Sequence, residues 1–375
     1  MAGRRFLLMH VTTSSGHHKA SRALEHALRR LDPLCQTINV DAFDYTSHFV
    51  RFAINRSYLQ LIRHHPDVWE YLYDNPAVHR RVQHIRGLLH RYHARKLQRL
   101  LETVQPHAMP CTQAFPSGMV ADFKKHHNLT VPLVGVLTDY APHLYWLHET
   151  VDRYIVPADE LRQRFISYGI QPSQIQATGI PIEPRFLDPV DRSAVYREFG
   201  LQPDQPVVLV MGGGSGFGPL RELMTRLGHV TTPCQIVLLA GTNRPLVEWC
   251  AHQRFSQRVV ARGYVESVPE LMDIASLLIT KPGGMTMSES LARRLPMLML
   301  SPIPGQEMCN ARYLLQQGAA LLLGAPDTAR EVVGSLLSDS VRLQQLRDRI
   351  GRLSKPDSAM QAAQSLIHLA DRNGR

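Results

Sequence analysis

The residues best suited to chemistry lie between Ile279 and Arg312, where two glycine turns each precede a helix-compatible segment. The apolar run that ends at Ile279 breaks at Lys281-Pro282-Gly283-Gly284, and the segment 285–294 follows directly. Glycines let backbone N–H groups approach a ligand, and the amides and positive dipole at a helix start favour an anion such as a phosphate. Glu289 lies about one turn further on, where its carboxylate could accept hydrogen bonds from ribose hydroxyls.

A second turn extends this candidate site. The apolar strand 296–300 ends at Pro302-Ile303-Pro304-Gly305, and the residues Gln306, Glu307 and Asn310 follow. Ligands of open α/β sheets bind beyond the carboxyl ends of the strands, so both turns should reach the same sheet edge. For the first turn alone, an ordinary strand-to-helix connection is an equal alternative; the second turn favours a binding site.

The segment TKPGGMTMSESLARRLPMLMLSPIPGQEMCNARYL resembles the nucleotide-sugar-binding motif of the glycosyltransferases that make monogalactosyl- and glucosyl-diacylglycerol. Those enzymes are relatives of the lipid-linked GlcNAc transferase of peptidoglycan synthesis. The resemblance implies donor-binding roles for residues of both turns and of the segment between them. These residues are Lys281, Gly283, Gly284, Met285, Thr286, Glu289, Gln306, Glu307 and Asn310.

The same resemblance implies an α/β fold of the GT-B type, in which two Rossmann-like domains face each other across a cleft. The length agrees, because 375 residues with 44% hydrophobic content exceed one ordinary α/β domain and fit two. We expect an acceptor and membrane-facing domain at residues 1–190 and a nucleotide-sugar domain at 191–352. A C-terminal helix at 353–375 should pack back on the first domain.

A second glycine-rich loop, GGGSGFGPL at residues 212–220, follows the apolar strand 206–211. It contains the spacing of a dinucleotide fingerprint, but the acidic residue expected about 20 positions later is absent. In the resembling family this loop lies against the diphosphate and sugar, although Ser215 stands where some members carry Glu. In this architecture, the backbone groups that directly follow a strand such as 259–261 usually bind the uracil. The loop and base candidates are Gly213, Gly214, Ser215, Gly216, Tyr264 and Val265.

Two adjacent histidines are the candidates for a catalytic base. The strand 6–11 leads into TTSSGHHKAS, and a helix is expected from residues 20 to 31. The loop is not a P-loop, because the spacing to Lys19 is wrong. The resembling family has a GH pair where the acceptor hydroxyl meets the donor sugar; His17 is the gapless match, and His18 is the alternative. A histidine can take a proton from a hydroxyl at neutral pH, although a helix-capping histidine is the structural alternative.

Further cleft residues are expected beyond the apolar strand 132–137. The string TDYAPHLYWLHETVDRYIVP is similar to a pattern of the same family, which implies cleft positions for Asp139, His143 and Trp146, the last two for the acceptor. Asp139 could orient the basic histidine or the acceptor, or it could be a turn residue at the strand end. Upstream, residues 108–121 predict a short strand, a turn at 116–118 and then a helix.

The charge and the N-terminal half indicate an acidic partner surface. The net charge of +10 and pI of 9.6 fit anionic lipid, a phosphorylated substrate or nucleic acid, and the family resemblance selects lipid and not nucleic acid. Residues 80–101 predict a basic amphipathic helix, with packing on the sheet favoured over lipid contact for the helix itself. The preceding aromatic-rich segment favours lipid contact through Phe49, Phe52, Tyr58, Trp69, Tyr71 and Tyr73.

The cysteines and hydropathy place the expected enzyme in the cytoplasm, peripherally attached to the membrane. Five widely spaced cysteines without a C-x-x-C pair argue against a disulfide framework or a zinc cluster. No stretch approaches the roughly 20 apolar residues that a spanning helix needs. The sequence also contains no D-x-D pair, so we expect metal-independent transfer with inversion and no cofactor.

Other functions stay open at this point. Within the enzyme class, a UDP-GlcNAc transferase acting on another lipid-linked acceptor is the alternative, and a nucleotide-sugar 2-epimerase shares the architecture. A non-enzymatic basic binder of lipid or nucleic acid would not depend on Glu289 or Glu307. Galactose, glucose, GlcNAc and glucuronate all fit a Gln-Glu pair.

Overall fold

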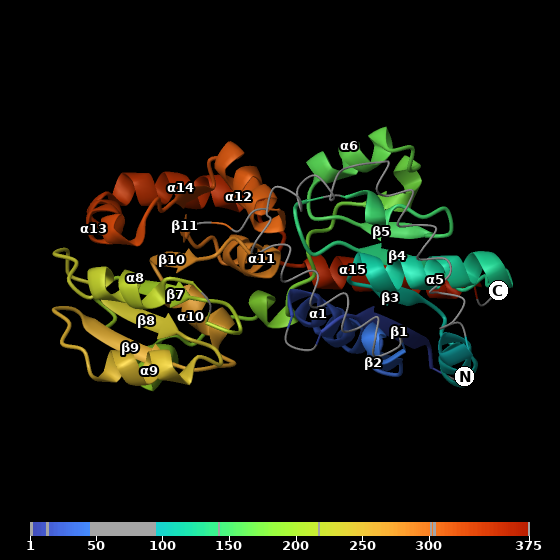
Figure 1. The fold of residues 1–375 in the computed structure, drawn as a ribbon, viewed down its shortest axis with the longest axis horizontal. Helices are drawn as coiled ribbons and strands as arrows, with labels where there is room; N and C mark the ends of the chain where they lie inside the picture. Colours follow the sequence, from blue (N-terminus) through green and yellow to red (C-terminus); the bar gives the residue numbers. More distant parts are fainter. Residues whose placement is uncertain are drawn as a thin grey trace. The chain divides into compact units, whose positions relative to one another are not determined.

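A parallel six-stranded sheet organises each half of the chain (Figure 1). The computed structural model describes residues 3–12, 15–45, 95–141, 143–216, 218–300, 302 and 305–373. These divide into two units. Unit 1 comprises Met1–Pro184, Ile303–Gln306 and Asp357–Arg375, and unit 2 comprises Arg185–Pro302 and Glu307–Pro356.

The sheet of unit 1 has the strand order β2-β1-β3-β4-β5-β6, and every pairing is parallel. The central strands β1, β3 and β4 read as short apolar runs because both faces are buried, whereas the edge strand β2 is polar and partly exposed. The strands are β1 (Arg5–His10), β2 (Gln36–Asp41), β3 (Met109–Cys111), β4 (Leu133–Val136), β5 (Arg153–Ile155) and β6 (Ile175–Gln176). The helices are α1 (Gly16–Leu31), η1 (Ala42–Tyr45), α5 (Ala114–His127), η2 (Leu144–Trp146), α6 (Asp159–Ser167), η3 (Pro172–Gln174) and α15 (Ser358–Asn373), and residues 95–104 are also helical.

The C-terminal helix α15 packs beside α1 over one face of this sheet (Figure 1). The contact is built from small residues on both helices, so the two backbones can approach closely. Ser358 at the start of α15 donates to the carbonyl of Ile180 at 2.8 Å, and Ser365 accepts from Arg153 of β5 at 2.9 Å. The packed residues include Ala23, Ala27, Ala359, Ala362, Ala363 and Leu366, which cover Phe6, Leu8, Val134 and Val136.

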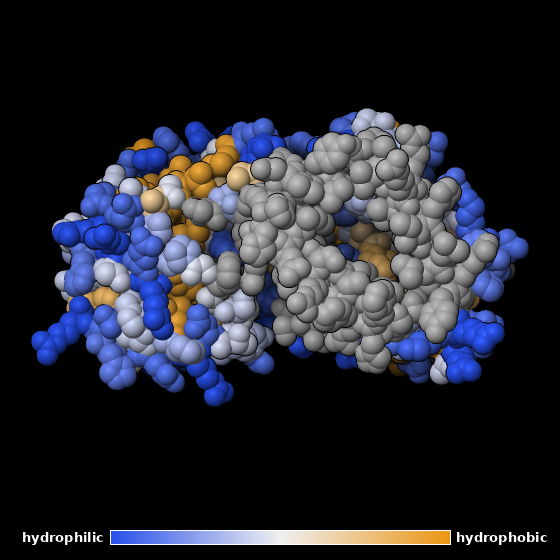
Figure 2. All heavy atoms as spheres, in the orientation of Figure 1, coloured by the Kyte–Doolittle hydropathy of each residue, from blue (hydrophilic) through white to orange (hydrophobic). Residues whose placement is uncertain are grey.

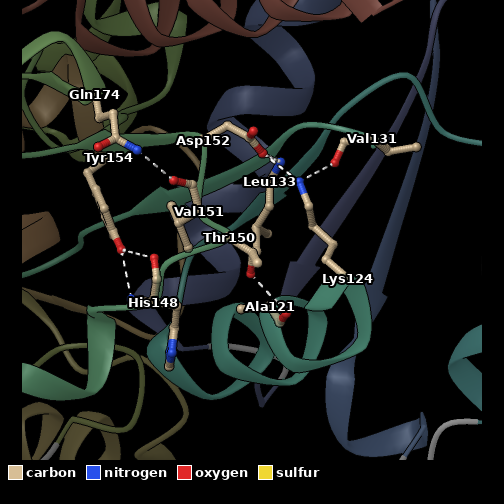
Figure 3. A network of polar contacts seen from close by, with 10 residues as sticks. All are labelled: Ala121, Lys124, Val131, Leu133, His148, Thr150, Val151, Asp152, Tyr154 and Gln174. Atoms are coloured by element: carbon tan, nitrogen blue, oxygen red, sulfur yellow. Dashed lines mark hydrogen bonds and ion pairs between the residues drawn. The ribbon is translucent and has the colours of Figure 1, made fainter. Parts of the chain in front are cut away.

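A buried lysine fixes the strand β4 against α5 and the start of β5. Figure 3 shows Lys124, on α5, reaching the carboxylate of Asp152 at 2.6 Å and the carbonyl of Val131 at 2.7 Å. The same Asp152 oxygen accepts the backbone N–H of Leu133 at 2.7 Å. Only 6% of the Lys124 side chain is exposed, so its charge needs both partners.

The sheet of unit 2 has the order β12-β11-β10-β7-β8-β9 and is also wholly parallel. Its core on one face joins alternate strand residues to α8, α9 and α13. The strands are β7 (Val207–Met211), β8 (Gln235–Leu239), β9 (Arg258–Arg262), β10 (Leu277–Thr280), β11 (Met297–Met299) and β12 (Ala320–Leu322). The helices are η4 (Pro184–Leu187), α7 (Arg192–Phe199), α8 (Leu220–Leu227), α9 (Arg244–Ala251), α10 (Val268–Ile274), α11 (Gly284–Ala292), α12 (Gln306–Gln316), η5 (Pro326–Thr328), α13 (Ala329–Ser338) and α14 (Ser340–Leu353).

Two helices begin earlier than the sequence predicted. Helix α1 starts at Gly16 and not at residue 20, because the Ser15 hydroxyl caps it by accepting the backbone N–H of His18 at 3.2 Å. Helix α5 starts at Ala114, so the turn predicted at residues 116–118 was wrong: those residues are helical, and Pro116 lies in the first turn. Proline is tolerated there because first-turn amides have no intrahelical partner.

The predicted lipid-contacting segment lies outside the described residues, and so does most of the predicted basic helix. In its described part, Leu97 and Leu101 are buried. Among the described helices, none is long and apolar enough to cross a membrane. On the face in Figure 2, hydrophilic residues dominate the coloured surface and apolar residues emerge in separate groups.

Candidate active site

Three neighbouring strands of the unit 2 sheet, β7, β10 and β11, end at the same edge. Strand β10 lies between β7 and β11, with Thr280 in register with Met211 on one side and Met299 on the other. The Thr280 hydroxyl also donates to the Met211 carbonyl at 3.0 Å. The strands are parallel, so the turn at 281–284, the glycine loop after β7 and the turn before α12 all begin at the carboxyl edge where α/β folds bind ligands.

Gly283 is the N-cap of α11. Neither its backbone conformation nor its described neighbours require a glycine at this position. Its φ of −74° is ordinary for any residue. A Cβ added at Gly283 would meet no heavy atom of the described residues within 4 Å. As a glycine, the N-cap residue has no side chain that could cap the first amides of the helix. The open space in front of a helix N-terminus suits a bound phosphate.

The expected donor residues of α11 lie mostly on its buried side. Gly284 and Met285 are buried and Thr286 is partly exposed. Glu289 is only 6% exposed, which is rare for a carboxylate unless it serves a specific partner.

Helix α12 is tied to the turn at 281–284 by two contacts. Lys281 Nζ lies 2.7 Å from Glu307 Oε1, in an ion pair whose side chains are 19% and 22% exposed. The wholly buried Asn310 donates from Nδ2 to the carbonyl of Pro282 at 3.1 Å. The structure therefore brings the two sequence motifs together. Gln306, the first residue of α12, is partly exposed beside Glu307.

The glycine loop after β7 divides into a structural part and an exposed part. Gly216 has a φ of +59°, and an added Cβ would lie 2.2 Å from the Ala240 carbonyl oxygen, so only glycine fits. Gly216 N–H also closes a turn on the Gly213 carbonyl at 3.1 Å. Gly213, Gly214 and Ser215 are exposed and open to a ligand.

The base candidates follow the edge strand β9, with β7 and β8 lying between it and β10. Gly241, after β8, links the two regions: an added Cβ on it would lie 2.2 Å from the Gly214 carbonyl oxygen, and one on Gly263 would lie 3.2 Å from the Gly241 oxygen. Tyr264, next in the chain, is 68% exposed. Close approaches between glycines therefore connect the glycine loop, through Gly241, to Gly263, and Tyr264 and Val265 directly follow Gly263.

In unit 1, His17 has a fixed tautomer. Its Nδ1 lies 3.0 Å from the Thr112 carbonyl oxygen and 2.8 Å from Thr138 Oγ1. A carbonyl can only accept, so Nδ1 carries the proton and Nε2 keeps its lone pair. Burial lowers the pKa of His17 from 6.5 to about 4, so the ring is neutral at pH 7. A neutral imidazole with a free lone pair can act as a general base.

His18 occupies a different environment. Its ring lies on that of His10, with centroids 4.5 Å apart and an interplanar angle of 31°. His10 in turn shares a hydrogen bond of 2.9 Å between its Nδ1 and Asn39 Oδ1. Burial lowers the pKa of His18 as well. Of the two candidates, His17 is the one whose Nδ1 is bonded to residues at the strand ends of unit 1, Thr112 and Thr138.

The residues that hold His17 were missed by sequence reasoning. Thr112 directly follows β3, and Thr138 follows β4, the neighbouring strand. The Thr112 hydroxyl also donates to the His17 carbonyl at 2.9 Å. Asp139, which the sequence proposed as the orienting partner, is the partly exposed neighbour of Thr138. The sequence feature that could have indicated these two residues is a threonine directly after a buried apolar strand.

The expected acceptor residues His143 and Trp146 pack on each other, with ring centroids 6.1 Å apart, and both are buried. Their loop is held from β5: the Tyr154 hydroxyl donates to the Trp146 carbonyl at 3.0 Å and accepts the His148 N–H at 3.1 Å. Figure 3 shows Tyr154 and Thr150 anchoring this loop, Thr150 through the carbonyl of Ala121 on α5.

Two parallel α/β sheets with glycine turns at their carboxyl edges define a protein of the GT-B fold class. Solved structures confirm this prediction. MurG of Acinetobacter baumannii has a TM-score of 0.62 at 12% identity, covering 97% of this chain and 99% of its own. CalG4, the calicheamicin glycosyltransferase, reaches 0.60 at 14%, covering 99% of both chains. The UDP-GlcNAc 2-epimerase of Neisseria meningitidis reaches 0.60 at 11%, covering 97% and 100%. Such low identities establish the fold alone.

Sequence comparison narrows the class. Residues 17–182 match the model of monogalactosyldiacylglycerol (MGDG) synthase, and residues 207–359 match the glycosyltransferase family 28 C-terminal domain. The processive diacylglycerol beta-glucosyltransferase of Bacillus pumilus is 31% identical over 280 residues, 74% of this chain and 72% of that protein. The Bacillus subtilis enzyme is 32% identical over 268 residues, 71% and 69%. The chain belongs to the diacylglycerol glycosyltransferase family and is a glycosyltransferase, as the resemblance predicted.

Proposed function

We propose that the enzyme transfers a hexose from a UDP-sugar to the hydroxyl of diacylglycerol, with inversion at the anomeric carbon. The observation that carries this proposal is the start of α11. Gly283 is required there neither by its backbone conformation nor by contact with the described residues, and it leaves open space among them at the point where the family's nucleotide-sugar motif stands. A phosphate group would fill that space and accept from the first helix amides.

The donor would be held by three adjacent strand ends of unit 2. Charge that develops on the leaving diphosphate would be met by the α11 amides and by the exposed glycines at 213–214. Glu289 would receive the ribose hydroxyls, Gln306 and Glu307 the sugar hydroxyls, and the backbone near Tyr264 the uracil. Preorganised amides supply this stabilisation without a metal, so we propose metal-independent transfer.

The acceptor would be activated from unit 1. His17 Nε2 takes the proton of the attacking hydroxyl as the new glycosidic bond forms and the bond to the diphosphate breaks. The imidazolium that results keeps its Nδ1–H on the Thr112 carbonyl and the Thr138 hydroxyl. One direct displacement inverts the configuration. His143 and Trp146 would line the acceptor side.

The proposed acceptor is a lipid, so the enzyme would work at a membrane surface, attached peripherally on the cytoplasmic side. The net charge of +10 supports an anionic membrane as partner. The alternative enzymes differ in their acceptor and in their product. A GlcNAc transferase would need another lipid-linked acceptor, and an epimerase would return an altered UDP-sugar without any acceptor.

The test is a screen of radiolabelled UDP-glucose, UDP-galactose, UDP-GlcNAc and UDP-glucuronate with diacylglycerol in anionic vesicles, with and without a chelator. We expect that one of the UDP-hexoses transfers its label to a glycolipid. The rate should be the same with and without the chelator. Vesicles without diacylglycerol are the control. Label that stays in an epimerised UDP-sugar, or that enters no lipid, contradicts the proposal; loss of activity with the chelator contradicts its metal-independent part.

A further inference from the structure

The ion pair between Lys281 and Glu307 joins a residue expected near the diphosphate to one expected at the sugar. Their Nζ and Oε1 atoms are 2.7 Å apart, and about four fifths of each side chain is covered. The backbone on both sides is fixed, because Asn310 of α12 holds the carbonyl of Pro282. The pair is therefore set by the packing of α12 on the turn at 281–284 and does not depend on a ligand.

Two roles for Lys281 can be separated on physical grounds. As a phosphate ligand, Lys281 would have to divide its three N–H donors and its charge between Glu307 and the diphosphate, which would weaken its hold on a largely covered carboxylate. As a partner of Glu307, it can stay where it is, because the amides at the α11 start and the exposed glycines offer the diphosphate uncharged donors. The second role leaves the whole charge of Lys281 with Glu307.

Resting on the function proposed above, we infer that Lys281 is a positioning residue for sugar recognition. Its ammonium fixes the orientation of the Glu307 carboxylate, and it does not bind the diphosphate. A carboxylate has two oxygens with several acceptor positions, so one group can accept from Lys281 and also from a sugar hydroxyl. Glu307 then selects a sugar that presents free hydroxyl donors, and Lys281 contributes to affinity only when a sugar is attached to UDP.

Binding of UDP and of UDP-glucose or UDP-galactose, measured by calorimetry on the full-length protein, tests this. In the Lys281→Met variant, we expect UDP affinity within about twofold of wild type and UDP-sugar affinity lower by about 10- to 100-fold, the range for a lost charged hydrogen bond. Glu307→Gln should show the same selective loss. The double variant should lose no more than either single variant, because both changes remove one pairing.

Control variants separate the role from a folding defect. Lys281→Arg can rebuild the pair and should recover most of the UDP-sugar affinity. Lys125→Met breaks an ion pair of 2.8 Å with Glu149 whose side chains are 64% and 83% exposed, and it should change neither affinity. Thermal melts verify that each variant is folded.

The outcomes are distinct. Equal losses of UDP and UDP-sugar affinity in Lys281→Met would make the lysine a phosphate ligand and overturn the inference. An unchanged UDP-sugar affinity, or a wild-type protein that binds UDP-sugar no more tightly than UDP, would overturn it too. A wild-type protein that binds no UDP at all would instead contradict the proposed function.

Discussion

The pH dependence of transfer should reveal the environment of His17. Burial lowers the pKa of this ring to about 4, whereas an ordinary histidine has a pKa near 6.5. At pH 5 a base of pKa about 4 is about 90% neutral, while one of pKa 6.5 is about 3% neutral. The active form at pH 5 therefore differs by about 30-fold between the two cases. We expect kcat/KM to stay near its maximum down to about pH 5 and to halve near pH 4.

The assay is UDP release at limiting UDP-sugar between pH 4 and 8, with wild type, His17→Gln and His18→Gln. Loss of the base should cost about 10²- to 10⁴-fold; the His18 variant should keep most of the activity. A fall in kcat/KM centred near pH 6.5, or a His17→Gln variant with more than about a tenth of wild-type activity, would refute the reasoning.

Stability needs a parallel control, because the same ring links folding to pH. The unfolded chain protonates His17 near pH 6.5 and the folded chain only near pH 4, so the unfolded state binds more protons in between. The contribution of the neutral ring is complete above about pH 6.5 and declines as the pH falls toward 4, by roughly 3 kcal/mol. Urea titrations at each pH show whether an activity loss is only unfolding.

Three further variants test the site and its support. Thr138→Val should lower kcat/KM about tenfold by removing one contact to His17 Nδ1, and Thr138→Ser should restore it in the same assay. Gly283→Ala should keep the wild-type melting temperature, because its Cβ meets no described atom, yet weaken UDP binding about tenfold or more in calorimetry. Lys124→Met should lower the free energy of unfolding by about 1–3 kcal/mol in urea titrations, less than a fully buried pair because the Asp152 side chain is 41% exposed.

Much of the fold was readable because a parallel sheet covered on both faces leaves uninterrupted apolar runs in the sequence. Strands β4, β7 and β10 fall within a residue or two of their predicted positions. The start of α1 was harder. Its first turn, Gly16 to Lys19, is polar and carries no apolar periodicity, so only the cap at Ser15 marks the boundary.

The contacts within the site were not readable, because they depend on which strands are neighbours. Thr112 and Thr138 stand 95 and 121 residues from His17 and reach it only because β1, β3 and β4 are adjacent. The same holds for Lys281 and Glu307, which the packing of α12 brings together across 26 residues. Sequence motifs indicated which residues matter, while strand order decided what each one touches.

The hydrogen-bond partners of His17 are uncharged. A second histidine of helix α1, His26, shows what a charged partner does to the pKa. His26, nine residues further along, pairs with the Glu183 carboxylate at 2.7 Å, and that contact raises its pKa. A carboxylate in the place of Thr138 would do the same to His17 and favour a protonated ring that cannot accept a proton. A carbonyl and a hydroxyl fix the same tautomer without adding charge. The base therefore stays unprotonated at neutral pH, and the proton it gains during transfer is held weakly enough to be released for the next cycle.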